Sequence, residues 1–275
     1  MDLYKHRGHI NIVNPNSTIY YIGTDAHTRF SKNYITDPTN LHLKYYKQNP
    51  IQYTFNNVGF RTPDDFNSED EGNIFLGCSH TFGTGHHLEN TWSYKLNQLV
   101  GGKFWNLGLP GTGVMTHYRL LKGYYKELKI KNIFHFAPKS YARYEFIVNH
   151  KPYPFVVGHT QKETEDLLGN LLLESLVNDD EIDFMYNSYI DAIRWLAYEI
   201  GANYYLCDET HNEFITYPDN SLYARDLEHL STLQQHSVYK YFVKKYDKSL
   251  LININDNLKV FDIQQLMHNI PTNIL

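Results

Sequence analysis

The sequence has little cysteine, no long apolar run and no excess of positive charge, and each of these absences excludes a class of protein. Cys78 and Cys207 are the two cysteines in 275 residues, too few for a disulfide framework, so we expect two reduced thiols. No run approaches the roughly 18 apolar residues of a transmembrane helix. The net charge of -5 gives no electrostatic reason to bind nucleic acid or an anionic membrane.

The amino-terminal segment Met1–His9 is polar and lacks the apolar core of a secretory signal, so we expect a cytoplasmic protein. Hydrophobic residues make up 42% of the chain and charged residues 20%, a balance typical of globular domains with a buried core. The length suits one α/β domain with about 60 residues left over. The composition gives no indication of the oligomeric state.

The chain divides at an acidic, turn-rich stretch, Thr62–Gly72. Before it, short β-like runs at Ile19–Ile22 and Ile51–Phe55 predict a small β-containing extension over residues 1–70. After it, over residues 71–275, compact apolar runs alternate with amphipathic stretches. That alternation predicts βαβ units and a mainly parallel sheet.

The alternation also places the elements. Short apolar runs predict buried strands at Asn73–Cys78, Lys103–Leu107, Asn132–Ala137 and Asn203–Cys207. Helical spacing of apolar residues, with capping signals, predicts helices over Trp92–Val100, Val114–Leu128, Ile182–Ile200 and from Ser231 to about Lys245, and a capping box at Thr160–Glu163 opens a further helical region. The tail from Lys248 to Leu275 is left unassigned.

A candidate nucleophile stands at the end of the first of these strands. Ser79 follows Gly77 and Cys78 and precedes a glycine-rich stretch, and ligands of open parallel sheets bind at the carboxyl ends of strands. A serine hydroxyl is a poor nucleophile unless a base lies within hydrogen-bond reach. Without such a base, Ser79 would be an ordinary residue of a glycine-rich turn.

A candidate base lies far downstream. Asp226 precedes His229 by three residues, a spacing that lets the carboxylate accept the imidazole Nδ1 proton on one tight loop. The Nε2 atom is then free to take a proton from Ser79. An Asp-x-x-His pair before the last long helix, combined with a strand-end serine upstream, indicates nucleophilic catalysis.

The three segments resemble the conserved blocks of the SGNH (GDSL-like) hydrolases. Gly77–Gly83 is similar to the nucleophile block, Asn106–Gly111 to the second block, and Asp226–His229 to the closing Asp-x-x-His. They lie in the order of that family, and the resemblance spans about Asn73 to Tyr246. The segment Tyr53–Arg61 also resembles a lead-in that precedes some SGNH domains.

The resemblance implies a three-layer α/β/α fold with a flavodoxin-like parallel sheet. It implies Ser79 as nucleophile, His229 as base and Asp226 as the residue that orients the base. The backbone N–H groups of Ser79 and Gly108 would hold the oxyanion. No cofactor or metal is implied.

Two positions depart from the family pattern. Cys78 stands where the first block has Asp, a change that leaves the nucleophile in place. The third block usually supplies an Asn as oxyanion donor, but Pro138–Arg143 contains none. A missing donor can lower kcat by about 10²–10³. Ser140 is a candidate replacement, as are Lys139 and Arg143.

Three other arrangements compete with this interpretation. A metal site could form from histidines near the strand ends, although their spacing fits no zinc pattern; the residues are His80, His86, His87 and His135, with Cys78. Asp25 and His27 could form an acid–base pair outside the sheet. The loop Gly108–Gly113 suggests a phosphate loop but lacks its lysine.

The function predicted from these residues is a serine-dependent acyl-ester hydrolase. The resemblance, together with the 24 tyrosines that could stack on sugars, favours an O-acetyl esterase acting on carbohydrate. A sugar hydroxyl in place of water would make the protein an O-acyltransferase. The missing third-block Asn leaves a further alternative, a glycan-binding or structural module on the same scaffold.

Overall fold

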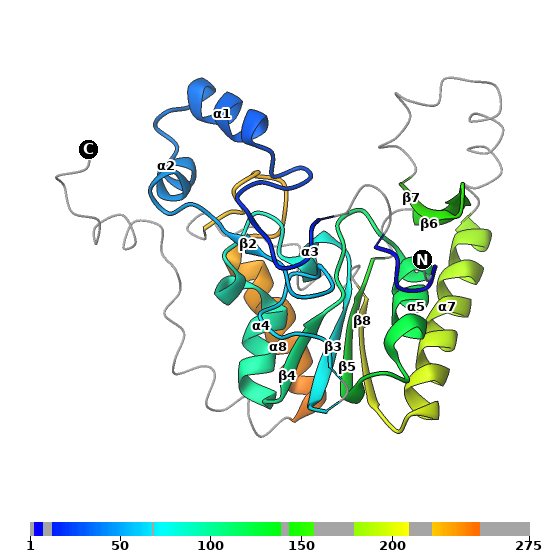
Figure 1. Ribbon diagram of the computed structural model, residues 1–275. Coiled ribbons are helices and arrows are strands. Elements are labelled where there is room, and N and C mark those ends of the chain that lie inside the picture. The colour runs from blue at the N-terminus through cyan, green and yellow to red at the C-terminus, as the bar shows by residue number, and fades with distance from the viewer. Residues whose placement is uncertain are drawn as a thin grey trace.

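Four parallel strands form the central sheet of the computed structural model, which describes residues 3–7, 13–67, 69–138, 143–156, 179–208 and 222–247. The strands lie side by side in the order β4 (Lys103–Asn106), β3 (Glu71–Gly77), β5 (Lys129–Ala137) and β8 (Asn203–Asp208) (Figure 1). Every neighbouring pair is parallel. Because the chain starts inside the sheet and then crosses to both sides, the order is flavodoxin-like.

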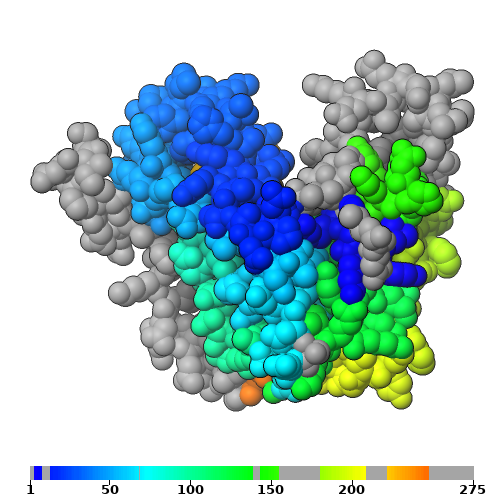
Figure 2. All heavy atoms as spheres, viewed as in Figure 1, coloured from blue at the N-terminus to red at the C-terminus, as the bar shows by residue number. Residues whose placement is uncertain are grey.

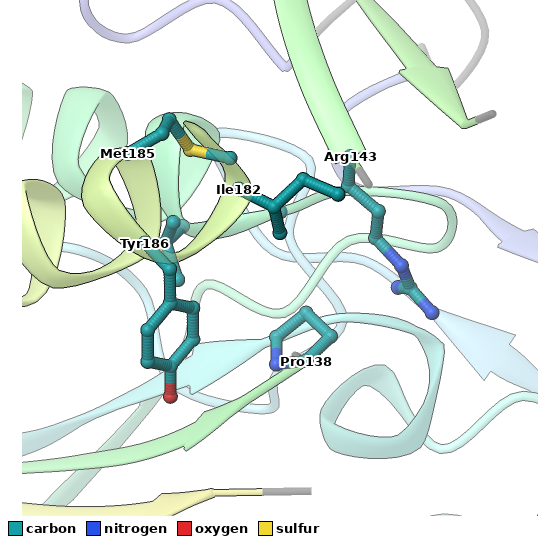
Figure 3. Close-up of a pocket in the computed structure, with 7 residues that line it drawn as sticks. Pro138, Arg143, Ile182, Met185 and Tyr186 are labelled. Carbon is teal, nitrogen blue, oxygen red and sulfur yellow. The ribbon is translucent and has the colours of Figure 1, made fainter. Parts of the chain in front are cut away.

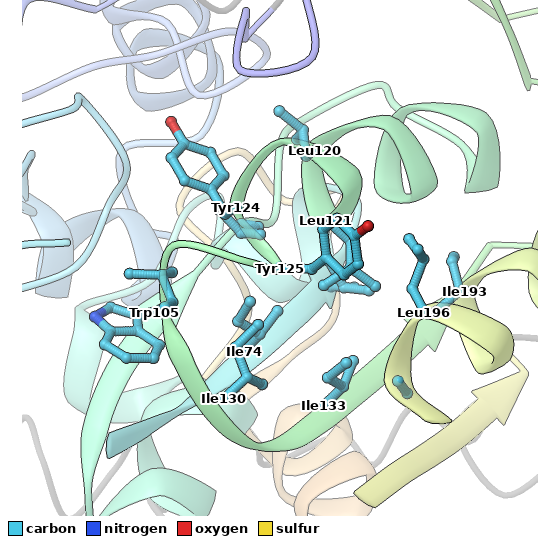
Figure 4. Packing of buried hydrophobic residues seen from close by; sticks show 14 of the residues in the cluster. Ile74, Trp105, Leu120, Leu121, Tyr124, Tyr125, Ile130, Ile133, Ile193 and Leu196 are labelled. Atoms are coloured by element: carbon cyan, nitrogen blue, oxygen red, sulfur yellow. The ribbon is translucent and has the colours of Figure 1, made fainter. Parts of the chain in front are cut away.

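Helices cover both faces of this sheet and make the three-layer fold. On one face, α5 (Val114–Tyr124) and α7 (Asp179–Glu199) bury Leu120, Leu121 and Ile193 against strand residues such as Ile74 (Figure 4). On the other face, α4 (Trp92–Val100) and α8 (Thr232–Tyr246) enclose an aromatic core. Its centre is a stack of Trp92 on Phe242, with ring centroids 4.7 Å apart. The predicted α/β/α fold is confirmed.

The predicted strands and helices of this core lie close to those observed, because apolar periodicity follows burial directly. Ser231 caps α8 with both bonds of its capping box. Two details differ: the helical spacing of apolar residues in Trp92–Val100 would place Leu99 on the buried side of α4, but it is 36% exposed, and α5 ends before Leu128. The predicted capping box at Thr160–Glu163 and the tail from Lys248 lie outside the described residues. No helix among those described combines the length and apolar character that crossing a bilayer requires.

The extension before the sheet contains more helix than the sequence predicts. Its strands β1 (Thr18–Ile19) and β2 (Tyr53–Thr54) pair antiparallel, and two short helices stand between them, α1 (His27–Thr36) and α2 (Leu41–Gln48). These residues lie above the carboxyl ends of the central strands, beside the four-residue helix α3 (Ser79–Phe82) and the 3-10 turn η2 (Leu88–Asn90) (Figures 1 and 2). The extension therefore covers the edge where the predicted site lies.

A second hairpin, β6 (Arg143–Val148) with β7 (Lys151–Val156), is not predicted from the sequence. Pro152 and Pro154 disfavour a strand because they lack the N–H that a sheet ladder uses. They stand two residues apart, so both missing donors lie on one side of β7. Among the strands that the structure describes, β7 pairs with β6 alone, so its other side needs no N–H donors and tolerates the prolines.

Candidate active site

Ser79 begins α3 immediately beyond the carboxyl end of β3 and is 8% exposed. The turn into α3 is tight, since the N–H groups of Thr81 and Phe82 both donate to Cys78 O. A Cβ at Gly77 would stand 1.9 Å from Thr81 Oγ1 and 2.8 Å from Phe136 O, so the close approach needs glycine. Among the described residues, no acceptor takes the Ser79 N–H, and the Ser79 hydroxyl faces Cys78 Sγ at 3.9 Å.

Arg61 and Gln235 hold α3 in place from two distant parts of the chain. The guanidinium of Arg61 donates to Phe82 O at 3.0 Å, to Gly83 O at 2.6 Å and to His86 O at 2.7 Å. Burial lowers the pKa of Arg61 to about 10, which leaves it charged at neutral pH. Gln235, on α8, donates to His80 O at 3.2 Å. In the sequence, Arg61 is marked only as the last residue of the segment Tyr53–Arg61, and no motif marks Gln235.

Asp226 and His229 form the hydrogen bond that their spacing predicts. His229 Nδ1 donates to Asp226 Oδ2 at 2.6 Å, while the N–H groups of Glu228 and His229 donate to Asp226 Oδ1 at 3.1 and 3.2 Å. Burial alone would raise the pKa of the Asp226 carboxyl, but these donors and Thr24 hold it well below its usual range. Asp226 is therefore ionised, and the Nε2 atom of His229 is the nitrogen left for a substrate or a nucleophile.

The loop that carries His229 lies directly against the segment that follows Ser79. Arg225 N–H donates to Gly85 O at 2.9 Å, and the His86 side chain donates from Nε2 to Leu230 O. Burial lowers the pKa of His86 to about 3, so its ring stays neutral. The imidazoles of His80 and His229 meet edge to face with centroids 5.3 Å apart. The two loops are thus joined on both sides of His229, and proton transfer between Ser79 and His229 stays a prediction.

The second-block loop is tied to α3 through Asn106. Asn106 Nδ2 donates to Thr81 O at 3.0 Å, and its Oδ1 accepts the Gly108 N–H at 2.9 Å. A Cβ at Gly108 would stand 2.7 Å from Phe82 N, so the glycine allows this loop to approach α3. Because its N–H is already used, Gly108 could donate to an oxyanion only after releasing Asn106.

Of the three candidates to replace the third-block Asn, the structure describes Arg143. Ser140 and Lys139 lie outside the described residues. Arg143 donates from Nη1 to Thr112 O at 3.1 Å, so that part of its guanidinium is committed to the second-block loop. Beside it lies a cavity of about 10 Å³, room for about one water molecule, lined by Gly113, Val114, Pro138, Arg143, Ile182, Met185 and Tyr186 (Figure 3). It is too small to accommodate a substrate.

Two of the buried histidines form a hydrogen-bonded chain that ends on the second-block loop. Tyr204 OH and His135 Nδ1 are 2.9 Å apart, as are His135 Nε2 and His117 Nδ1, and His117 Nε2 lies 3.3 Å from Thr112 Oγ1. Thr112 donates its hydroxyl proton to Leu109 O at 2.7 Å. His117 Nε2 must then be the donor to Thr112, and the same logic places the proton of neutral His135 on Nε2. Tyr204, His135, His117 and Thr112 then each donate one hydrogen bond along this chain.

These contacts bear on the alternative arrangements. The ring of His135 is hydrogen-bonded to His117, and the ring of His86 is hydrogen-bonded to Leu230 O. These two histidines near the strand ends therefore do not point at one common centre. Within the described ranges, no group of three or more His, Cys, Asp or Glu side chains is placed to hold a metal ion. The carboxylate of Asp25 binds Arg225, at 2.8 and 2.6 Å, and Tyr53, and among the described contacts it forms no hydrogen bond with His27.

Comparison with known proteins adds little to this geometry. No family model matches the chain, and no curated protein matches it. A solved structure of a protein assigned to the G-D-S-L lipolytic family, from Desulfitobacterium hafniense DCB-2, aligns with 63% of this chain and 98% of its own. The identity is 15% and the TM-score 0.31. A likeness of this size does not indicate which residues act in this chain.

Proposed function

We propose that the protein is a serine-dependent acyl-ester hydrolase with Ser79 as nucleophile and His229 as base. The observation that carries the proposal is the 2.6 Å hydrogen bond from His229 to the buried carboxylate of Asp226, on a loop bonded to the segment that follows Ser79. A carboxylate in that position fixes the tautomer of the imidazole and stabilises the imidazolium that forms. A purely structural loop has no need of a buried carboxylate bonded to an imidazole in this position.

The reaction proceeds in two halves. Ser79 Oγ attacks the ester carbonyl as its proton passes to His229 Nε2, and the imidazolium then returns that proton to the leaving alcohol. The acyl group stays on Ser79 until water attacks, again with His229 as base, and the acid and free Ser79 are released. The Ser79 N–H is the donor available to the oxyanion, and Gly108 would join it if Asn106 turned away.

The test is hydrolysis of p-nitrophenyl acetate by the wild type and by Ser79→Ala. We expect the rate to fall by about 10⁴-fold or more, because the covalent route is removed. Ser237→Ala is the matched control: its hydroxyl donates to Leu233 O on α8, away from the site, and its rate should equal that of the wild type. Equal hydrolysis by the wild type and Ser79→Ala would exclude Ser79 as nucleophile.

A fluorophosphonate probe separates the hydrolase from a binding module on the same scaffold. Such probes react with serines that a neighbouring base has activated. We expect one label, located on Ser79 by mass spectrometry, and no label in His229→Gln. Folded wild-type protein that takes up no label would contradict the proposal.

A further inference from the structure

A tight turn of the amino-terminal extension lies on the Asp226 carboxylate. Ile22 and Asp25 exchange backbone hydrogen bonds of 3.1 and 3.0 Å, and Gly23, the first residue between them, has φ +55°. Positive φ at this position alone is the pattern of a type II′ turn, for which glycine is favoured. The turn directs the side chains of Thr24 and Asp25 towards two consecutive residues, Asp226 and Arg225.

Thr24 binds the same carboxylate oxygen as the proposed base. Its hydroxyl donates to Asp226 Oδ2 at 2.9 Å, and that oxygen also accepts His229 Nδ1 at 2.6 Å. The other oxygen, Oδ1, accepts the backbone N–H groups of the loop itself. Among the described residues, Thr24 is the single donor to Asp226 that comes from outside the 226–229 loop, so it fixes that loop against the rest of the protein.

Asp25 anchors the turn that presents Thr24. Its carboxylate forms a bidentate ion pair with Arg225, and both side chains are 1% exposed. The same carboxylate accepts a hydrogen bond from the Tyr53 hydroxyl. Tyr53 OH in turn accepts the Gly85 N–H at 2.8 Å, in the segment that follows Ser79. The turn is therefore held by the base loop and the nucleophile segment together, which fixes the position of Thr24 against both.

We propose that Thr24 is a positioning residue of the active site, acting through Asp226. Its hydroxyl holds Oδ2 where it accepts His229 Nδ1 and shares the negative charge of the carboxylate, so the imidazole stays in the orientation that leaves Nε2 free to act as base. The role rests on the proposed hydrolase function. It makes the turn at residues 22–25 part of the catalytic machinery, although neither the motifs nor the sheet includes it.

The experiment compares Thr24→Val with Thr24→Ser. Valine keeps the shape and loses the donor, so we expect kcat to fall about tenfold with KM changed less than about twofold, the effect of losing a supporting hydrogen bond to a catalytic group. Serine restores the hydroxyl and should recover most of kcat. Both variants should melt within about 2 °C of the wild type. If the contact of Thr24 served only the stability of the fold, their kcat values would therefore be the same.

The chain offers a matched control in Thr39. Its hydroxyl donates to the exposed carboxylate of Asp37 at 2.7 Å, the same chemistry away from Asp226, so Thr39→Val should keep the wild-type kcat. The acid limb of kcat/KM should move to higher pH in Thr24→Val, because a carboxylate that has lost a donor attracts the imidazolium more strongly. Wild-type kcat and an unshifted limb in Thr24→Val would overturn the proposal.

A measurement without substrate tests the role of Thr24 independently of whether the protein hydrolyses esters. The proton between His229 Nδ1 and Asp226 gives its own low-field NMR signal whether or not Ser79 turns over. We expect Thr24→Val to shift that signal, and Thr24→Ser and Thr39→Val to leave it in place. A signal unchanged in Thr24→Val rejects the positioning role even if Ser79→Ala abolishes hydrolysis, and a shifted signal supports it even if the wild type hydrolyses no ester.

Discussion

Removing the carboxylate of Asp25 should destabilise the protein more than its place outside the central sheet would indicate. Asp25 and Arg225 are both 1% exposed, with N–O distances of 2.8 and 2.6 Å, and Tyr53 donates to the same carboxylate. Asn at position 25 keeps the size of the side chain but removes its charge. The guanidinium of Arg225 would then be buried beside a neutral amide.

The structure sets the size of this effect. Breaking a buried ion pair by removing one partner costs about 3–5 kcal/mol, because the remaining charge is desolvated without compensation. At roughly 2–4 °C of Tm per kcal/mol for a chain of this size, Asp25→Asn should melt about 10 °C below the wild type. Activity should fall as well, since the same turn holds Thr24 on Asp226.

The assay is urea unfolding followed by circular dichroism for Asp25→Asn and for a cycle of Asp25→Leu, Arg225→Met and the double variant. Each single change leaves one buried group without its partner, whereas the double change removes both charges at once. We expect the double variant to lose less free energy of unfolding than the sum of the singles, by at least about 2 kcal/mol. Additive losses, or an Asp25→Asn protein within about 1 kcal/mol of the wild type, would refute the assignment of this pair as a coupled buried anchor.

Three further outcomes are expected, two from the same network and one from buried His135. In Gly85→Ala, a Cβ would stand 2.8 Å from Ala224 Cβ at a residue with φ +77°, so the two loops must separate; we expect a loss of about 2–4 kcal/mol in unfolding and a lower kcat. Asp226 has a folded pKa below its unfolded value, so its contribution to stability is present above about pH 4 and lost below it. The difference in unfolding free energy between the wild type and Asp226→Asn should therefore narrow as the pH falls from 4 to 2. Burial lowers the pKa of His135 to about 3, so between pH 6.5 and 3 only the unfolded chain takes up a proton at this side chain. As the pH falls through the upper half of that range, the unfolding free energy of the wild type should therefore decrease more than that of His135→Gln.

The sheet and its helices could be predicted from the sequence because they depend on local pattern. The strand beginning at Lys129 is buried at almost every position, and the stripe of α7 repeats with helical period over 21 residues. The hairpin at Arg143–Val156 could not be predicted, since its two prolines argue against a strand unless it is known that β7 pairs with β6 alone among the described strands. The helices α1 and α2 were not predicted for a different reason: both are polar overall, and α1 contains no buried residue while α2 buries only two, so neither has the apolar content that marks a core helix.

The candidate site shows the same division between local and distant information. Asp226 and His229 are three residues apart, and their hydrogen bond follows from a single turn of chain. Thr24 lies 202 residues from Asp226 in sequence, in an exposed turn whose one signal is a glycine. A single hydroxyl that reaches a distant carboxylate leaves no periodic trace in a sequence. Arg61 is similar: its buried guanidinium donates to three backbone carbonyl groups, which every residue has and which no motif records.

The polar contacts of the extension concentrate where the chemistry is proposed. Arg61 satisfies carbonyl groups at the end of the helix that Ser79 begins, Asp25 neutralises the residue before Asp226, and Thr24 binds Asp226 itself. A covering that only buried apolar surface would not need buried charged groups, whose desolvation is costly. Their presence is understandable if the loops of nucleophile and base must be held in one arrangement. The predicted boundary near residue 70 thus separates two sequence patterns, while the residues of the proposed site and the side chains that hold them come from both sides of it.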